Sequence, residues 1–378
     1  MRVVIAADKF KGSLSAAEVA SALARGLKKG VMSDVELTLV PVADGGDGTV
    51  DAAVWAGFER ISVPSVGPTG EPVLASYAAR GPRAVVELAD VVGLGKLPEG
   101  RFDPLGASTY GLGVVMRDAI DRGAHQVVLG VGGSASTDGG AGMVQALGAR
   151  LLDSSGSEVG RGGAALADVV SLDPTGLEDE TGPTHILVAS DVDNPLLGPR
   201  GATRIFGPQK GAGAPELERL ESALTTWAAV VAKACGHDYS GVAGAGAAGG
   251  TAFAAVALLG AELRPGIDVM LEIVGFAEAV AGADLVVTGE GSLDEQSLAG
   301  KAPVGVATAA QAAGVPVVAV CGRCELDAEQ LGRAGIAAAY PLSDLEPDAP
   351  RSMADAASLV TRVGEQIAEQ WLVRRETR

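Results

Sequence analysis

Glycine-rich loops that also carry hydroxyl and carboxylate side chains recur along this chain of 378 residues. Two of them span residues 44–49 (DGGDGT) and 132–140 (GGSASTDGG), and each follows a run of apolar residues. Glycine lets the backbone turn its N–H groups toward an anion, and a helix that starts beside the loop adds partial positive charge. A single loop of this kind is more often only a tight turn, but several in one chain favour phosphate binding.

Pairs of carboxylates follow apolar runs in the same way. Asp191 and Asp193 come directly after the run 185–190, and Glu290 and Asp294 follow the run 284–288. Mg²⁺ prefers oxygen ligands and is usually bound by one or two carboxylates together with phosphates. Asp-x-Asp-Asn is also a common turn and cap sequence, so a purely structural role stays open for the first pair. The pattern favours Mg²⁺-assisted phosphoryl transfer.

An acidic protein that binds anionic substrates needs cations in its site. Lys9 and Lys11 are the first candidates, because their loop connects a buried strand to the start of a helix. Lys210 lies in a second basic, glycine-rich stretch, and Arg323 follows a predicted strand end, where it would meet a substrate carboxylate. For Lys9 and Lys11, an ordinary solvated side chain is the alternative.

Other motifs carry less weight. Residues 244–249 (GAGAAG) match the dinucleotide fingerprint, but the preceding residues make a poor strand and no acidic residue ends a second strand about 20 residues on. Cys321 and Cys324 have redox-motif spacing, yet one CxxC without a second is more often structural. Lys301 lacks the upstream glycine and the Ser/Thr of a P-loop. If the chain is a kinase, it is not a P-loop kinase.

The elements that position these loops alternate between strand and helix at both ends of the chain. Strands are expected over 2–7, 35–43, 284–288, 315–320 and 336–340, and helices over 15–30, 49–55, 303–313, 327–334 and 352–372, with a loop over 289–297. This alternation predicts a parallel sheet covered on both faces. In the middle of the chain, 73–79 and 84–88 are expected to be antiparallel or mixed strands, and 126–131 and 185–190 further strands.

Length and composition bound the remaining possibilities. The length predicts two domains, and the simplest architecture joins residues 1–65 and 281–378 into one α/β domain, with 66–280 inserted as a second. With 29 basic and 47 acidic residues the net charge is −18, which argues against nucleic acid and anionic membranes as partners. Three cysteines do not make a disulfide framework. We expect a cytoplasmic protein, and the sequence leaves open whether it forms a homodimer.

Motifs from one end of the chain to the other resemble, in order, those of the bacterial type-1 glycerate kinase family. They span 8–15 (DKFKGSLS), 43–49 (ADGGDGT), 132–135 (GGSA), 191–196 (DVDNPL), 206–211 (FGPQKG) and 288–294 (TGEGSLD). The resemblance implies ATP-dependent, Mg²⁺-assisted phosphorylation of D-glycerate, usually at the 2-hydroxyl. It also implies a flavodoxin-like parallel-sheet domain built from both chain ends, with an inserted second α/β domain. The position after Asp8 varies in the family between Lys and Ser, so Lys11 is the stronger catalytic candidate.

In this interpretation glycerate lies in a cleft between the two domains and is converted to 2-phosphoglycerate or 3-phosphoglycerate. Lys11 and Lys210 offset charge on the transferring phosphoryl group; Asp191 is the first candidate to accept the hydroxyl proton and Asp44 the second. The expected metal ligands are Asp191, Asp193 and Asp294. The other expected substrate- and phosphate-binding residues are Asp8, Lys9, Ser13, Gly45, Gly46, Gly132, Gly133, Ser134, Lys210, Glu290 and Arg323. A kinase for another small hydroxy acid, a nicotinamide dehydrogenase and a non-catalytic anion sensor stay open as alternatives.

Overall fold

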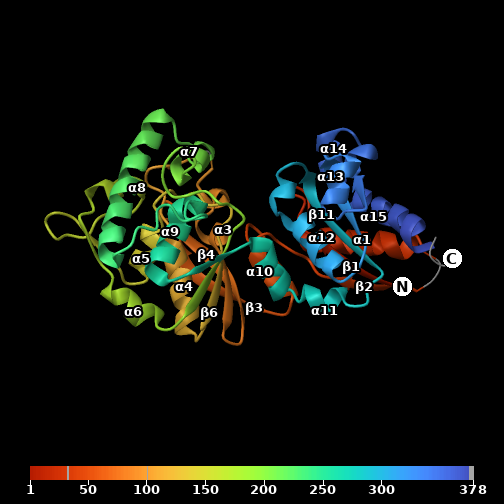
Figure 1. Ribbon diagram of the computed structural model, residues 1–378, viewed down its shortest axis with the longest axis horizontal. Coiled ribbons are helices and arrows are strands. Elements are labelled where there is room, and N and C mark those ends of the chain that lie inside the picture. Colours follow the sequence, from red (N-terminus) through yellow and green to blue (C-terminus); the bar gives the residue numbers. More distant parts are fainter. Residues whose placement is uncertain (32–33, 100, 374–378) are drawn as a thin grey trace. The chain divides into compact units, whose positions relative to one another are not determined.

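The computed structural model describes residues 1–31, 34–99 and 101–373, and the chain divides into two compact units. Unit 1 comprises Met1–Asp44, Asp51–Gly57 and the chain from Ile267 to its end, so it is built from both chain ends (Figure 1). Unit 2 comprises Gly45–Val50 and Phe58–Gly266. The glycine loop that follows Asp44 therefore belongs to unit 2, whereas the sequence places the domain limits near residues 65 and 281.

The sheet of unit 1 has the strand order β13-β12-β11-β1-β2, and every neighbouring pair is parallel. Counted within the unit, this is the 2-1-3-4-5 order of flavodoxin-like folds, so the expected fold of this domain is confirmed. The strands are β1 (Arg2–Ala7), β2 (Glu36–Leu39), β11 (Leu285–Leu293), β12 (Val317–Cys324) and β13 (Ala338–Pro341).

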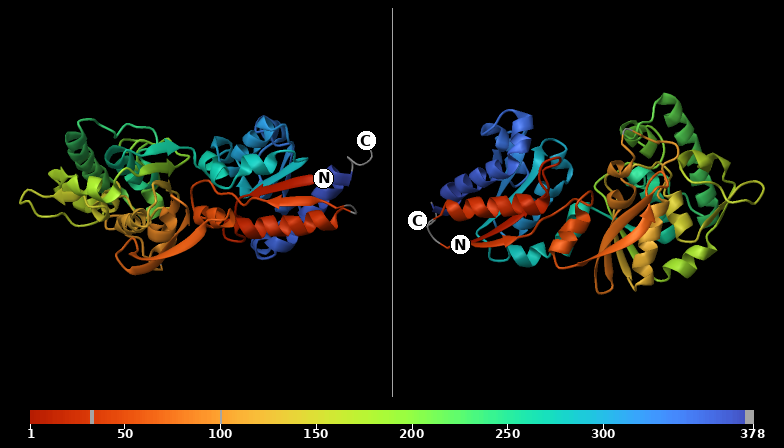
Figure 2. Two further views of the ribbon diagram at one scale, coloured as in Figure 1. Left: turned by 90° about the horizontal axis from the view of Figure 1, so that it is seen from below. Right: turned by 180° about the vertical axis from the view of Figure 1, so that it is seen from behind.

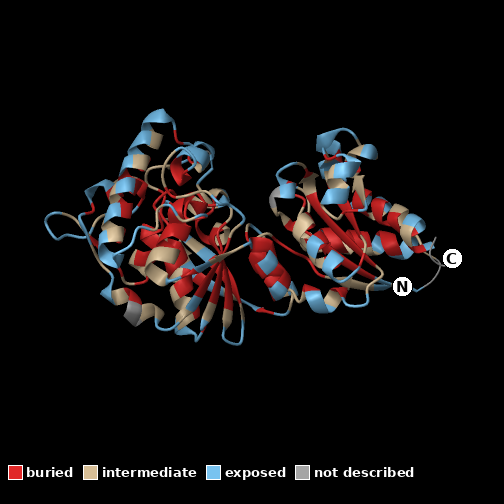
Figure 3. Cartoon of the chain, viewed as in Figure 1, coloured by how far each residue is buried: buried red, intermediate tan, exposed pale blue. Residues whose placement is uncertain are grey.

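Alternate residues of β1 enter two different cores. Val3 and Ile5 pack with α1 (Ala16–Lys29) and α15 (Ala356–Ile367), whereas Val4 packs with α12 (Ala302–Ala312). Side chains of a strand alternate between its faces, so helices on both sides bury most of the central strands β1, β11 and β12 (Figure 3). The other helical segments of the unit are α2 (Thr49–Trp55) and α10 (Gly266–Ile273), which cross the unit limits, and α11 (Phe276–Val280), η4 (Ser297–Ala299), α13 (Ala328–Arg333), η5 (Leu342–Asp344), α14 (Ala349–Ala354) and the π-helical η6 (Ala368–Leu372).

Helices α1 and α15 lie side by side (Figure 2), and glycine makes their close approach possible. A Cβ on Gly26 of α1 would overlap the Thr361 carbonyl oxygen and lie 2.8 Å from the Gly364 Cα.

The start of α1 is set locally, because the Ser15 side chain accepts from the Glu18 amide while the Glu18 carboxylate accepts from the Ser15 amide. These two contacts form a capping box.

Three predicted elements of this unit differ from the structure. The expected loop over 289–297 begins as strand, since β11 continues to Leu293 and pairs with an equally extended β12. Gly289 looks like a loop residue in the sequence, but here it lets the two strands approach. The expected helix over 352–372 is three segments, because Asp348 caps a separate helix, α14, which ends before Asp355. The second strand covers only Glu36–Leu39.

Unit 2 contains a mixed sheet of the order β10-β9-β6-β5-β4-β3. The pairs from β10 to β5 are parallel, whereas β4 is antiparallel to β5 and β3, which confirms the expected mixed pairing. A smaller sheet pairs β7 with β8. The strands are β3 (Glu59–Val66), β4 (Pro72–Arg80), β5 (Arg83–Glu87), β6 (Gln126–Gly130), β7 (Arg150–Leu152), β8 (Ser171–Asp173), β9 (His185–Ala189) and β10 (Glu262–Arg264).

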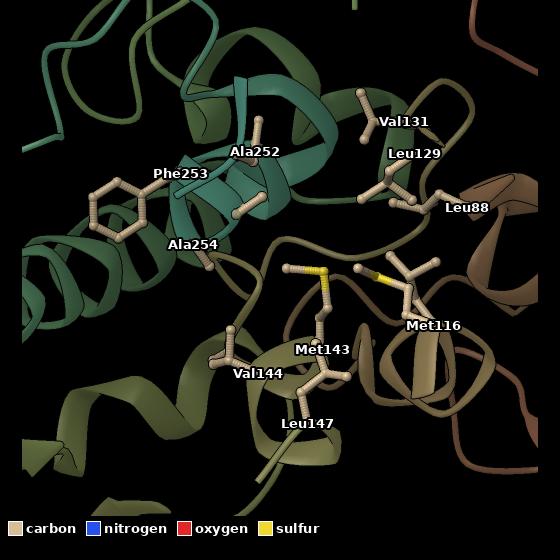
Figure 4. Close-up of a cluster of buried hydrophobic side chains, with 14 of the residues drawn as sticks. Leu88, Met116, Leu129, Val131, Met143, Val144, Leu147, Ala252, Phe253 and Ala254 are labelled. Carbon is tan, nitrogen blue, oxygen red and sulfur yellow. The ribbon is translucent and has the colours of Figure 1, made fainter. Parts of the chain in front are cut away.

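One face of this sheet packs against helices in a core of aliphatic, methionine and aromatic side chains. Leu129 of β6, Met116, Met143 and Phe253 contribute to it from four different elements (Figure 4). The helical segments of the unit are α3 (Leu88–Val92), η1 (Leu94–Lys96), α4 (Tyr110–Asp121), α5 (Ala141–Ala146), η2 (Gly163–Asp168), α6 (Thr175–Thr181), α7 (Ala202–Phe206), η3 (Pro208–Lys210), α8 (Ala214–Cys235) and α9 (Ala247–Leu259). In the part of the chain that the structure describes, no helix is both long and apolar enough to cross a membrane.

The contact between α1 and α15 yields a stability prediction. Gly26→Ala should lower the free energy of unfolding by about 1–3 kcal/mol, because the added methyl group must push the two backbones apart. Gly332→Ala is the matched control, since this glycine of α13 has open space around its Cβ position and should gain about 0.5–1 kcal/mol. Urea unfolding of both variants measures the difference; equal stability would contradict the close crossing.

Candidate functional site

The carboxyl ends of β1 and β11 lie side by side within the sheet of unit 1. β2, which follows β1 in this sheet, lies on one side of the pair, and β12, which follows β11, lies on the other side. The strand order therefore reverses between β1 and β11. Ligands of open α/β sheets bind outside the carboxyl ends of the strands at such a switch point. Asp8 directly follows β1, and its amide donates to the Gly289 carbonyl at 2.8 Å. Glu290 is the next residue of β11, so two acidic residues lie at the switch point.

Asp8 is a buried carboxyl group with only 9% of its surface exposed. The pKa of Asp8 is raised from 3.8 to about 7, mainly by burial, and the nearby Asp44 and Glu290 contribute to this rise. Lys9 opposes the rise through its charge and through its amide, which donates to Asp8 Oδ1 at 2.6 Å. The structure therefore brings together Asp8, Lys9, Asp44 and Glu290, all of which the sequence predicts as site residues.

Glu290 is also 9% exposed, and burial is the main cause that raises its pKa. The Ser297 hydroxyl and the Lys301 ammonium oppose this rise, and Lys301 Nζ lies 4.0 Å from Glu290 Oε2. The other carboxylate oxygen, Oε1, is buried and has no hydrogen-bond partner among the described residues. Glu290 thus has one oxygen that nothing in the described chain satisfies.

A short closed loop positions Lys11 and Ser13 at the same edge. Phe10 and Leu14 bond to each other in both directions, at 2.8 and 3.0 Å, and the buried Phe10 anchors the loop in the core. Ser13 Oγ donates to the Phe10 carbonyl at 3.0 Å, and the side chain of Lys11 is exposed. A Cβ on Gly291 would lie 3.4 Å from the Lys11 amide nitrogen, which places this loop beside β11.

The remaining predicted residues of unit 1, Asp294 and Arg323, already have partners in the chain. Asp294 Oδ1 accepts from the Gln296 amide at 2.9 Å and from the Ser297 amide, so this carboxylate closes the loop after β11. Arg323 Nε donates to Ser292 Oγ at 3.0 Å across the β11–β12 pair. Both residues follow the switch point along β11 and β12.

In unit 2 the two glycine loops pack against each other at the carboxyl ends of parallel strands. The Gly132 amide donates to the Gly45 carbonyl at 3.3 Å, and a Cβ on Gly132 would lie 2.5 Å from the Gly46 Cα. Gly45 has a φ of +87°, and a Cβ there would lie 2.8 Å from the Ala189 carbonyl oxygen at the end of β9. Both the left-handed backbone and the contact distance require glycine at this position.

A buried glutamate holds the first of these loops. Glu87, at the end of β5, is 5% exposed, and its carboxylate accepts from the Gly48 amide at 3.2 Å and from the Val50 amide at 3.0 Å. Burial is the main cause that raises its pKa from 4.5 to about 7, while those amides oppose the rise. The Gly48 amide of the expected phosphate loop and the Val50 amide just after it therefore already bind a carboxyl group of the protein itself.

A buried lysine holds the second loop. Lys210 is 1% exposed, and its Nζ donates to Ser134 Oγ at 2.8 Å and to the Ser136 carbonyl. Burial lowers its pKa from 10.5 to about 7, and the nearby Asp138 opposes this change. A Cβ on Gly249 would lie 2.9 Å from Lys210 Nζ, so the start of α9 encloses the ammonium group. Its predicted role in offsetting phosphoryl charge stays a prediction; the contacts present orient the loop around Gly133 and Ser134.

The Asp-x-Asp pair lies in the exposed segment after β9. Asp191 Oδ1 accepts from the Gly266 amide at 2.7 Å, and Asp193 forms two hydrogen bonds of 2.9 Å with the Arg200 guanidinium. Among the side chains that the structure describes, no three from His, Cys, Asp or Glu could hold a metal ion together. A cation bound there would need further ligands, such as water, backbone carbonyls or the phosphates of a substrate.

Comparison with known proteins shows which family this chain belongs to. The profile of the glycerate kinase family matches residues 3–372. The chain belongs to the glycerate kinase family. It is 46% identical to a glycerate kinase of Bacillus subtilis (strain 168) and 43% identical to a glycerate 2-kinase of Escherichia coli (strain K12), with 90% of each chain covered in both cases. A solved structure assigned as glycerate kinase 2 from Salmonella typhimurium LT2 superposes with a TM-score of 0.87 at 39% identity and covers 100% of this chain and 99% of that chain.

Membership of the glycerate kinase family confirms the expected enzyme class, a phosphotransferase that acts on an alcohol group. It also agrees with setting aside the dinucleotide fingerprint. Residues 236–246, which are all described, contain no strand before the glycine run, and Ala248, Gly249 and Gly250 have positive φ values within α9.

Three polar residues at these strand ends were not singled out from the sequence. Glu87 and Lys301 contact the predicted loops directly, and Asp138 is buried, with Oδ2 accepting from the Thr109 amide at 2.7 Å. For Glu87 a signal exists, since it is the one charged residue in the apolar run 84–88. Asp138 lies in the glycine loop 132–140, of which only Gly132, Gly133 and Ser134 were predicted to be site residues. Lys301 does not match a P-loop, and its contact with Glu290 depends on tertiary packing.

The raised pKa of Glu87 predicts how stability depends on pH. Between about pH 4.5 and pH 7 the folded protein holds this proton more tightly than the unfolded chain does, so the free energy of unfolding falls as the pH rises through this window. Glu87→Gln should remove that fall, which for a shift of this size amounts to about 3 kcal/mol. Urea unfolding at several pH values, with Glu218→Gln on the exposed face of α8 as the control, measures it. A difference between Glu87→Gln and the parent chain that stays constant from pH 4.5 to pH 7 would contradict the prediction.

Proposed function

We propose that this enzyme transfers the γ-phosphoryl group of ATP, bound with Mg²⁺, to the 2-hydroxyl of D-glycerate. The observation that carries the proposal is the group of acidic and basic side chains at the β1/β11 switch point, in a chain that belongs to the glycerate kinase family. The relative from Escherichia coli is named a glycerate 2-kinase, which favours the 2-hydroxyl over the 3-hydroxyl.

Phosphoryl transfer depends mainly on positioning and on offsetting charge, and the chain offers groups for both. Lys11, exposed on its closed loop beside β11, would offset negative charge on the transferring phosphoryl group. The amides around Gly132 and Ser134, in a loop held by Lys210, would contact phosphate oxygens. The expected cleft between the domains stays a prediction.

The proton of the glycerate hydroxyl needs an acceptor, and two carboxylates are candidates. We favour Asp191, because its contact with the Gly266 amide orients one oxygen in an otherwise exposed segment. Asp44 is the second candidate, because it lies near Asp8 at the switch point. In a loose transition state such a base contributes less than the groups that offset charge.

Mg²⁺, when bound with ATP, offsets charge on the phosphate oxygens. The contacts of each candidate carboxylate show which residues fit this ion. Asp193 would first have to leave Arg200, and Asp294 already accepts from the amides that close its loop. Asp8 and Glu290 fit better, since both are buried carboxylates and Glu290 Oε1 has no partner among the described residues.

Lys11→Ala tests the role of the closed loop. The variant should keep its fold, since the side chain is exposed, and should lose at least about 10²-fold in kcat. Lys28→Ala, at an exposed position of α1, is the control and should retain the activity of the parent chain. A coupled assay of ADP release measures both. Turnover near that of the parent chain in Lys11→Ala would remove this lysine from the site.

The reaction itself is tested by phosphorus NMR of the product made from ATP and D-glycerate. We expect the resonance of 2-phosphoglycerate. The resonance of 3-phosphoglycerate would refute the choice of hydroxyl, and no phosphorylated glycerate would refute the substrate. Lactate and 3-hydroxypropionate, which each retain one of the two hydroxyls, show in parallel whether the enzyme accepts other small hydroxy acids.

A further inference from the structure

The strand ends at the switch point of unit 1 bring two buried carboxylates together. Asp8 leaves β1 hydrogen-bonded to Gly289, and Glu290 is the next residue on the neighbouring strand β11. Each is 9% exposed, so neither is surrounded by water that would screen its charge. Asp44 lies close enough to interact electrostatically with both of them.

The basic groups nearby offset only part of this negative charge. Lys301 Nζ lies 4.0 Å from Glu290 Oε2, at the outer limit of an ion pair, and Lys9 interacts with Asp8. Glu290 Oε1 remains buried without a hydrogen-bond partner among the described residues. A buried, unsatisfied carboxylate oxygen is costly, and a bound cation is one of the few groups that would satisfy it.

The chemistry of Mg²⁺ fits a site of this limited size. Mg²⁺ is usually held by one or two carboxylates, with substrate phosphates and water completing the shell, rather than by a cage made of protein alone. In the described part of the chain no three potential ligands could hold a metal by themselves. A pair of carboxylates at a switch point, where the phosphates of a ligand would come to lie, meets these requirements.

We propose that Asp8 and Glu290 are the protein ligands of the divalent cation that accompanies ATP. This inference rests on the proposed use of Mg²⁺ and ATP, and it replaces the pair Asp191 and Asp193 as ligands. Lys301 then has a defined place as well, since it balances the second oxygen of Glu290. Asp191 keeps its candidate role toward the glycerate hydroxyl.

Binding of Mn²⁺ tests the proposal without any turnover. Electron paramagnetic resonance counts free Mn²⁺ in the presence of the intact enzyme and the non-hydrolysable analogue β,γ-imido-ATP. Glu290→Gln and Asp8→Asn should each raise the Kd for Mn²⁺ at least about tenfold, because each removes one of two protein ligands. Asp284→Asn, which precedes the opposite end of β11, is the matched control and should leave the Kd unchanged.

Competing assignments are separated by further variants. Asp193→Asn and Asp191→Asn should bind Mn²⁺ as the parent chain does; a tenfold loss in either, with Glu290→Gln unaffected, would overturn the proposal. Thermal unfolding of Glu290→Gln gives a second measurement. Without metal, the variant should have a higher Tm than the parent chain, because a buried charge has been removed. With Mg²⁺ and the analogue, the rise in Tm that the parent chain shows should be absent. An unchanged response to Mg²⁺ in this variant would equally overturn it.

The two proposals fail in distinguishable ways. If the parent chain makes phosphorylated glycerate but Glu290→Gln and Asp8→Asn bind Mn²⁺ normally, the assignment of the ligands is wrong and the function stands. If the parent chain makes no phosphorylated glycerate while these variants lose Mn²⁺, the substrate is wrong and the cation site stands.

Discussion

A parallel sheet covered by helices on both faces can place polar groups only at its edges and strand ends. In unit 1 the side chains of β1 alternate between two apolar cores, so the polar residues of this segment begin where the strand ends, at Asp8. β11 continues to Leu293, but its apolar run ends at Val287 and Glu290 follows within the strand. All strands of this sheet run in one direction, so these residues meet at one end of it.

Buried charges, rather than surface ones, hold the loops at the strand ends of unit 2. Glu87 binds the amides of Gly48 and Val50, and Lys210 binds the loop that carries Ser134 and Ser136. Each of these groups loses its hydration on folding, and the displaced pKa values record that loss. Such interactions fix a loop more firmly than exposed ion pairs would, because water does not screen them. Loops that must present amides to a phosphate benefit from this rigidity.

The whole chain is acidic, although the proposed substrates are anions. A net charge of −18 repels phosphate at long range, so affinity must come from local groups. Lys11 and a cation bound by Asp8 and Glu290 in unit 1, and the glycine loops in unit 2, are the groups that would supply it. Phosphoryl transfer needs little covalent chemistry from the protein, so such local electrostatics account for most of what an enzyme of the glycerate kinase family has to provide.

The motifs, the capping box at Ser15 and the flavodoxin-like class could be predicted from the sequence, because each depends on neighbouring residues or on a run of motifs in order. Strand limits were less predictable, as β11 shows: glycines that are typical of loops serve there to let two strands approach. The partners of Asp193, Asp294 and Lys210 and the burial of Glu87 and Glu290 depend on which segments pack together. The residue type determines whether a side chain can carry a charge. Its hydration, its partners and therefore its chemical role depend on contacts between residues far apart in the chain.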